Sequence, residues 1–222
     1  MQGIFQMKRL LALSVSILML SVAVAACGVL GERGSGTMAI EARDVSGFNA
    51  IDLSGSGTVH VSVTGTETLT VEAEDNILPL LTTEIRDGTL FLGSKQSISP
   101  TREIVYTITV ISLEAVAVSG SGSVTAVDVD ANDFEVDISG SGTVTPTGVS
   151  SDLDLSISGS GRFEGEGLAA TTGTVSVSGS GSAVVSVTDD LEVNISGSGT
   201  VEYIGDPAIS TSISGSGKIS RR

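Results

Sequence analysis

The chain has 222 residues, of which 40% are hydrophobic and 3% aromatic, and its formal net charge is −15. This apolar content excludes a disordered chain, and the length suits one domain. The negative charge repels phosphate backbones and anionic headgroups, so we expect no nucleic-acid partner.

The N-terminal segment has the form of a secretion signal, with Lys8 and Arg9 before an apolar run that ends at Ala26. The sequence Val24-Ala25-Ala26-Cys27 resembles the bacterial lipobox. The resemblance implies that residues 1–26 are a lipoprotein signal peptide and that Cys27 is lipidated. Two or three acyl chains would hold the protein on a membrane, because each buried methylene contributes about 0.8 kcal/mol. An ordinary cleaved signal and an uncleaved anchor helix are the alternatives.

A glycine-rich segment without hydrophobic periodicity follows, so we expect a flexible tether over residues 27–37, at most about 35 Å long. The folded domain is predicted over residues 38–222. Gly28, which follows the cysteine, resembles the signal for the outer membrane in bacteria that have one. The predicted location is therefore outside the cytoplasm, anchored to the cell membrane or the outer membrane.

The tetrapeptide Ser-Gly-Ser-Gly dominates the rest of the chain. Its seven copies begin at Ser54, Ser119, Ser139, Ser158, Ser178, Ser196 and Ser214. The last five gaps between copies are 20, 19, 20, 18 and 18 residues. A fixed period near twenty is typical of stacked repeats, in which no single unit buries its apolar face alone.

Apolar residues hold constant positions around each copy. The residue just before the tetrapeptide is always Leu, Val or Ile, and apolar residues alternate with polar ones before it, which predicts a strand with one buried face. A second apolar column follows the tetrapeptide at Val59, Val124, Val144, Phe163, Ala183, Val201 and Ile219. Each repeat is therefore predicted to be a strand, a tight corner, a second strand and a loop.

Glycine suits the corner because it accepts positive φ and lets neighbouring backbones approach. The predicted structural turn glycines are Gly55, Gly57, Gly120, Gly122, Gly140, Gly142, Gly159, Gly161, Gly179, Gly181, Gly197, Gly199, Gly215 and Gly217.

The first two copies are 65 residues apart, close to three periods, which predicts about two coils without the tetrapeptide between them. Within this interval we expect a loop or helical turn around Pro79, a tight turn at Asp87-Gly88, and a strand from 104 to 110. The predicted fold class is all-β: a parallel β-helix (solenoid) of about eight coils of 18–20 residues, right-handed. An up-and-down antiparallel β-fold is the alternative.

The motif order also resembles a known family. The segment 47–57 (GFNAIDLSGSG), the acidic Glu74-Asp75-Asn76, the turn Asp87-Gly88-Thr89-Leu90 and the serial tetrapeptides are similar to those of the head GIN domain family, bacterial envelope proteins described as autotransporter adhesins. The resemblance covers about residues 40–220. It implies a β-helix-like stack and brings no catalytic residues.

Few residues can carry chemistry. His60 is the only histidine, and we expect it to face solvent, so no Ser-His-Asp or multi-histidine metal site can form. The densest carboxylates, as candidate calcium ligands, are Asp128, Asp130, Asp133, Glu135 and Asp137. No calcium-loop motif surrounds them, so a solvated face is the preferred interpretation. We predict no metal site and no cofactor.

We therefore expect no enzyme but a membrane-anchored envelope protein with an adhesion or scaffold role. An extracellular glycan or protein would be its ligand. One alternative is a glycan-binding or polysaccharide-cleaving β-helix, although Tyr106 and Tyr203 are isolated and basic residues are scarce in the repeats. A calcium-stabilised surface module is the other.

Overall fold

The computed structural model describes residues 31–222, so the predicted signal peptide and Cys27 lie outside the described residues. The described chain is all-β with one short 3-10 helix, Leu78–Leu80. The strands are β1 (Glu32–Arg33), β2 (Met38–Arg43), β3 (Ala50–Gly55), β4 (Thr58–Val63), β5 (Thr68–Glu74), β6 (Leu81–Arg86), β7 (Thr89–Ser94), β8 (Ile98–Ser99), β9 (Val105–Val110), β10 (Ala115–Gly120), β11 (Ser123–Gly140), β12 (Thr143–Gly159), β13 (Arg162–Gly179), β14 (Ser182–Gly197), β15 (Thr200–Ile204), β16 (Ala208–Gly215) and β17 (Lys218–Arg221).

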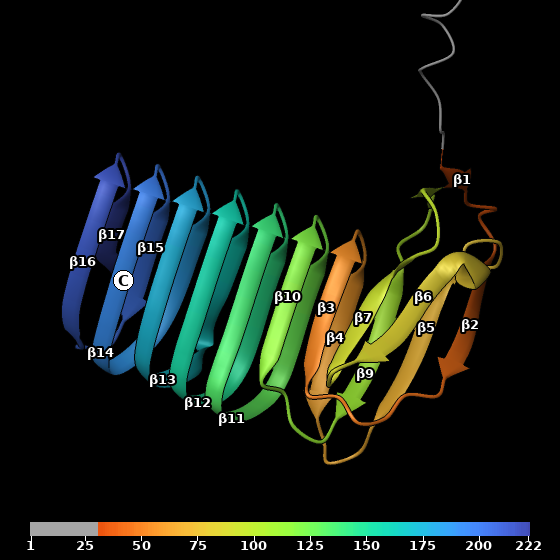
Figure 1. Ribbon diagram of the computed structural model, residues 1–222, viewed down its shortest axis with the longest axis horizontal. Helices are drawn as coiled ribbons and strands as arrows, with labels where there is room; N and C mark the ends of the chain where they lie inside the picture. The colour runs from red at the N-terminus through yellow and green to blue at the C-terminus, as the bar shows by residue number, and fades with distance from the viewer. Residues whose placement is uncertain (1–30) are drawn as a thin grey trace, which may run out of the picture. The chain divides into compact units, whose positions relative to one another are not determined.

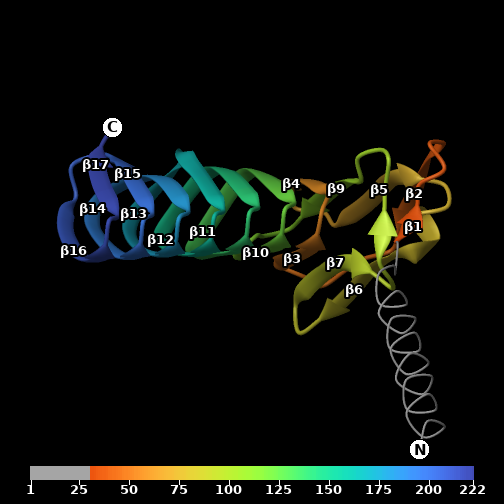
Figure 2. The ribbon, with the colours of Figure 1, turned by 90° about the horizontal axis from the view of Figure 1, so that it is seen from above.

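The repeats form a β-solenoid of about five turns, built from two limbs of parallel strands (Figures 1 and 2). The front limb contains β3, β10, the C-terminal halves of β11 to β14, and β16. The back limb contains β4, the N-terminal halves of β11 to β14, β15 and β17. Each of β11 to β14 runs continuously through the bend that joins the limbs, where the sequence predicted a loop.

The solenoid is right-handed. In Figure 1 the front strands point upward, the strands behind them run downward, and successive turns advance to the left, toward the C-terminus. This is the hand that parallel crossover connections almost always take. The predicted parallel β-helix is confirmed.

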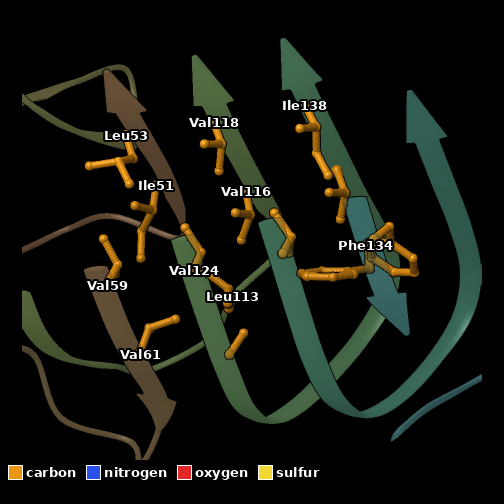
Figure 3. Close-up of a cluster of buried hydrophobic side chains, with 14 of the residues drawn as sticks. Ile51, Leu53, Val59, Val61, Leu113, Val116, Val118, Val124, Phe134 and Ile138 are labelled. Carbon is orange, nitrogen blue, oxygen red and sulfur yellow. The ribbon is translucent and has the colours of Figure 1, made fainter. Parts of the chain in front are cut away.

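Equivalent residues of successive repeats lie side by side. Ser119 pairs with Ser139 and Ile138 with Ile157, so each column of the sequence becomes a column of the structure. The apolar columns of both limbs face each other and are almost fully buried (Figure 3), except in the last turn, where Ile209 and Ile213 are exposed. Phe134 lies among them beside Leu153 of the next turn. Val and Ile suit this core because their branched side chains pack well on a pleated surface.

The two glycines of each corner are required for different steric reasons. Gly140 has φ +120°, and a Cβ there would lie 2.6 Å from the carbonyl oxygen of Gly120 in the preceding turn. A Cβ on Gly142 would instead lie 2.5 Å from Cγ1 of Val118, inside the core. The first glycine permits the positive φ angle of the corner, and the second leaves room for the apolar side chain of the preceding turn.

The first two tetrapeptides lie in adjacent turns, so the prediction of two intervening coils, and with it the count of about eight, is wrong. Ser54 pairs directly with Ser119. The residues between them leave the solenoid on its N-terminal side and return, forming a cap. In the cap β7 pairs in parallel with β3 and β9 with β4. Beyond that layer β6 pairs antiparallel with β7, β5 with β9, and β2 with β5.

The local turn signals within this interval are confirmed. Asp87 and Gly88 have φ values of 50° and 80° and join β6 to β7 as a hairpin. Two positive φ angles are what a two-residue turn of this kind requires, and Asp-Gly is a preferred pair. The 3-10 helix contains Pro79, and β9 forms the strand expected from 104 to 110.

The compact unit begins at Glu32, whereas the sequence predicts tether as far as residue 37. Strand β1 pairs in parallel with β8, and Gly36 donates a backbone hydrogen bond to the carboxylate of Glu74. Residues 32–37 therefore lie against the cap. Polar contacts to residues far along the chain hold them, which hydrophobic periodicity does not reveal.

Candidate functional surface

The outward side of the front limb, here called the front face, is the most regular surface of the described chain. It is turned toward the viewer in Figure 1. The first serine of every tetrapeptide points outward from it, and the parallel register places each of these serines beside the next. Strand spacing sets neighbouring serines about 4.8 Å apart. Since core residues lock each strand from behind, the column is fixed in position.

The front face carries negative charge without compensation on its own strands. No Lys or Arg occurs in its strand segments. Glu135 pairs with Asp154, and Asp133 with Asp152, so two pairs of carboxylates stand on neighbouring strands. Thr172 Oγ1 donates a 2.6 Å hydrogen bond to Asp152. Like charges that lie opposite each other across strands repel, and exposure to water keeps this cost small.

The candidate calcium ligands do not converge. Asp133, Glu135 and Asp137 alternate with buried residues along one strand, so neighbouring carboxylates start about 6.6 Å apart. Asp128, with φ 60°, and Asp130 lie at the bend. Residues 31–222 contain no group of three or more His, Cys, Asp or Glu that could hold a metal ion. The calcium-stabilised alternative therefore has no geometric support in the described part of the chain.

The front face has a shallow hollow of about 360 Å³. Its lining is uncharged and comes from four neighbouring strands, namely Ser156, Ser158, Ser176, Ser178, Asn194, Ser196, Ser212 and Ser214 with Ile157, Val177 and Ile195. Among residues 31–222, Ser54 is the only tetrapeptide serine whose hydroxyl bonds another protein side chain, Asp52 at 3.3 Å. The hydroxyls that line the hollow are thus available to an outside partner.

A second hollow, of about 380 Å³, lies on the opposite side and is lined by charged residues. Arg222 lies 2.7 Å from Glu166 and 3.9 Å from Glu202, and Arg162 lies 3.9 Å from Glu164. Each carboxylate of the hollow is therefore close to a guanidinium. Polysaccharide cleavage by paired carboxylates needs one of them as a protonated acid, a state that a neighbouring cation opposes.

His60 on β4 and Tyr106 on the neighbouring cap strand β9 face opposite sides of the sheet. His60 is exposed between Thr107 and Thr125, as predicted. Tyr106 is buried inside the cap end of the core, and burial raises its pKa to about 12. Tyr106 therefore cannot serve as an exposed aromatic platform for a sugar.

Two polar residues of the cap, Glu74 and Arg43, hold distant segments together, a role that the sequence did not predict for them. Glu74 is 1% exposed, and hydrogen bonds, above all from the Thr101 hydroxyl, hold its pKa below the ordinary value although burial opposes this. Arg43 donates to the carbonyl oxygens of Leu78 and Leu81, at 2.9 and 3.0 Å. Both contacts span 27 or more residues, so no local pattern could show them.

The described residues include no helix that is long and apolar enough to span a membrane. A search of curated proteins finds no match. The model of one protein family, described as "Putative auto-transporter adhesin, head GIN domain", matches residues 47–207. The chain belongs to this family. The match starts at the segment before the first tetrapeptide and includes most of the cap, without β2, as well as most of the solenoid.

Solved structures of other proteins have the same fold as this head GIN domain. A putative adhesin from Bacteroides fragilis is 23% identical, with a TM-score of 0.70, and the match covers 86% of this chain and 100% of that one. A putative adhesin from Parabacteroides distasonis, also 23% identical, has a TM-score of 0.57 with the same coverage. A third protein, a putative lipid binding protein from the same species, has 23% identity and a TM-score of 0.53 over 86% and 98% of the two chains. At these identities the comparisons bear on the fold alone.

Proposed function

We propose that the protein is a lipid-anchored envelope protein whose front face makes non-enzymatic adhesive contacts outside the cytoplasm. The front face carries this proposal. It presents identical hydroxyl groups at regular spacing from a rigid core and lacks cations on its strands. A flat array of this kind suits many weak, repeated contacts, which gain strength through multivalency.

The family description supports an adhesive role, and the lipobox-like sequence before Cys27 supports the anchor. An anchored domain needs no strong single site, because attachment to one surface raises its effective concentration at that surface. In the hollow on the opposite side, the carboxylates of Glu166 and Glu202 lie close to the Arg222 guanidinium, an arrangement that favours binding over catalysis. The ligand would be an extracellular glycan or protein.

The anchor is tested by intact mass and membrane fractionation of the native protein beside Cys27→Ser. We expect membrane-bound wild type whose mass fits an acylated chain starting at Cys27, and a soluble variant. A wild type that is soluble and carries no acyl mass would contradict the anchor.

The adhesive face is tested with beads that carry the purified chain, applied to a film of extracellular matrix harvested from bacterial cultures. The front-face variant is Ser158→Arg with Ser196→Arg. The matched control is Thr143→Arg with Thr200→Arg, in a back-limb column that already holds Arg162 and Lys218. We expect the film to retain at most about a tenth as many beads that carry the front-face variant as beads that carry the control, since each front-face substitution places a bulky cation on the serine column. Equal retention by both variants would contradict the assignment.

A further inference from the structure

Residues 32–37, here called the strap, connect the cap to the segment that contains Cys27. Three consecutive side chains, at the end of β5 and just after it, hold the strap. The Glu74 carboxylate accepts a 2.6 Å hydrogen bond from Gly36 N, and Asp75 accepts one of 2.5 Å from Ser35 Oγ. Asn76 accepts from Ser35 N at 2.9 Å and donates to the carbonyl oxygen of Arg33 at 2.8 Å.

Glu74 ties the strap to a second segment. Its carboxylate also accepts hydrogen bonds from the backbone N and Oγ1 of Thr101, at 2.8 and 2.5 Å, and from Arg102 N at 3.3 Å. The strap backbone lies close against this carboxylate, since a Cβ on Gly34 would stand 1.8 Å from its oxygen. Only glycine permits this approach. One buried carboxylate thus joins the strap to the loop before β9.

Polar contacts provide the attachment of the strap. Its sequence, Glu-Arg-Gly-Ser-Gly-Thr, contributes no apolar side chain to the core, and five of its six residues are exposed. Strand β1 adds two backbone hydrogen bonds to the β8 region, Glu32 N to Ser97 O and Gly34 N to Ser99 O. Segments with few buried apolar contacts open at the lowest free energy, so the strap is expected to open before the rest of the cap.

Opening of the strap should end at strand β2. Strand β2, which follows the strap, pairs with β5 over six residues. Its last residue, Arg43, is fastened to the chain around the 3-10 helix by two hydrogen bonds to backbone carbonyls. Release of six residues from the cap adds roughly 20 Å of extended chain.

We propose that the strap is a tension-release device: it detaches from Glu74, Asp75 and Asn76 as a unit when the anchor is pulled and lengthens the connection to the membrane while the cap and solenoid stay folded. The proposal rests on the anchored function proposed above. A longer connection lets a domain that is bound to a surface stay bound while the two surfaces move apart.

Single-molecule stretching of the full chain tests this. In chain produced without acylation, one handle is attached to the thiol of Cys27, the only cysteine of the sequence, and the other to Ser158→Cys, an exposed position in the solenoid. We expect a first lengthening of roughly 20 Å at a force below that of any other event. A first event that already includes unfolding of the cap would overturn the proposal.

Variants assign the event to the strap contacts. Asn76→Ala should lower the force of the first event and leave later events unchanged. Glu74→Gln should also lower the force of the first event, and it should weaken the cap as well, because Glu74 also accepts hydrogen bonds from Thr101 and Arg102. The matched control is Glu72→Gln, on the same strand but without a contact to the strap. Should Glu74→Gln fail to fold, Asn76→Ala decides the outcome. An event that neither variant shifts belongs to another segment, and the proposal is then wrong.

Native-state hydrogen exchange gives a second measurement that needs no anchor. The amides of Gly34 and Gly36 should exchange faster than those of β5, and Asn76→Ala should speed them at least about tenfold. Exchange of strap and β5 amides at one common rate in all variants would show that the strap opens only with the cap. Because Cys27→Ser fractionation tests the anchor separately, failure of the anchor and failure of the strap are distinguishable.

Discussion

The solenoid and the cap reach similar burial in different ways. In the solenoid each turn repeats the columns of the turn before it, so the same few residue types recur and corner glycines stack on corner glycines. In the cap the strands differ from one another, run antiparallel at the end, and depend on Glu74 and Arg43 for connections between distant segments. Strands of different construction cover the N-terminal edge of the stack, whereas the last described turn, β16 and β17, is a further copy of the repeat and leaves Ile209 and Ile213 40% and 42% exposed.

The largest expected effect comes from the corners, where only the solenoid has stacked glycines. Gly159→Ala should destabilise the protein by about 3 kcal/mol or more, since φ is +122° and the new Cβ would lie 2.7 Å from the Gly140 oxygen. Gly173→Ala is the matched control, with no positive φ and its nearest contact a Val187 methyl at 3.3 Å. It should cost under about 1 kcal/mol. Denaturant unfolding measures both, and equal costs would contradict the account of the corners.

Core truncation compares the two regions directly. Leu155 in the solenoid and Leu90 in the cap are both 0% exposed. Each Leu→Ala variant should lose about 2–5 kcal/mol of unfolding free energy, because burial rather than repetition sets the cost. Val149→Ala, at a position 51% exposed, should change it by less than about 0.5 kcal/mol. A Leu90→Ala variant as stable as Val149→Ala would show that the cap adds little to the fold.

Acid should weaken the cap through Glu74. The hydrogen bonds that it accepts hold its pKa below the ordinary 4.5, so the folded state binds the proton less tightly than the unfolded chain does. The stabilisation is therefore present above about pH 4.5 and is lost as the pH falls through the folded-state pKa. The stability gap between wild type and Glu74→Gln should shrink as unfolding is measured from neutral pH down to about 3. Glu72→Gln is the control, and a gap that widens in acid would contradict the sign.

The smallest expected effect on stability comes from the negative charges of the front face. Raising salt from about 0.01 M to about 1 M should stabilise the wild type by under about 1 kcal/mol, because it screens the repulsion between Glu135 and Asp154. The double variant Glu135→Gln with Asp154→Asn should respond less to salt. Glu41→Gln, which removes a carboxylate paired with Arg43, serves as control. Thermal unfolding across the salt series measures these responses.

The sequence predicted what local or periodic patterns determine. Alternating residues such as Val136 and Ile138 identified the front strands, and the period near twenty identified the stack. Asp87-Gly88 specified its hairpin because a two-residue turn depends only on its own backbone. The spacing of the tetrapeptides gave a wrong prediction between Ser54 and Ser119, which pair directly. Hydrogen-bonded pairing decides which strands are neighbours, and a chain segment of any length can leave the sheet and return to the same edge.

The alternation of apolar and polar residues also made part of the candidate surface predictable. The outward serines follow from the alternation that buries Ile157 and Val177. The positions of Glu74 and Arg43 were not predictable, because their partners lie 27 and 35 or more residues away and carry no motif. The carboxylates from Asp128 to Asp137 are close in sequence but stand apart along an extended strand, so density in sequence did not mean a cluster in space.

The direct stacking of the first tetrapeptide on the second is the central claim, since it separates the cap from the solenoid. Nitroxide spin labels at Ser54→Cys and Ser119→Cys, in a Cys27→Ser background, measure the distance by electron paramagnetic resonance. Adjacent turns place the two Cα atoms about 5 Å apart and predict strong spectral broadening. The control pair Ser54→Cys with Ser139→Cys, two turns apart at about 10 Å, should broaden much less. Weak broadening for the first pair, as expected for about 14 Å across two intervening coils, would contradict the account.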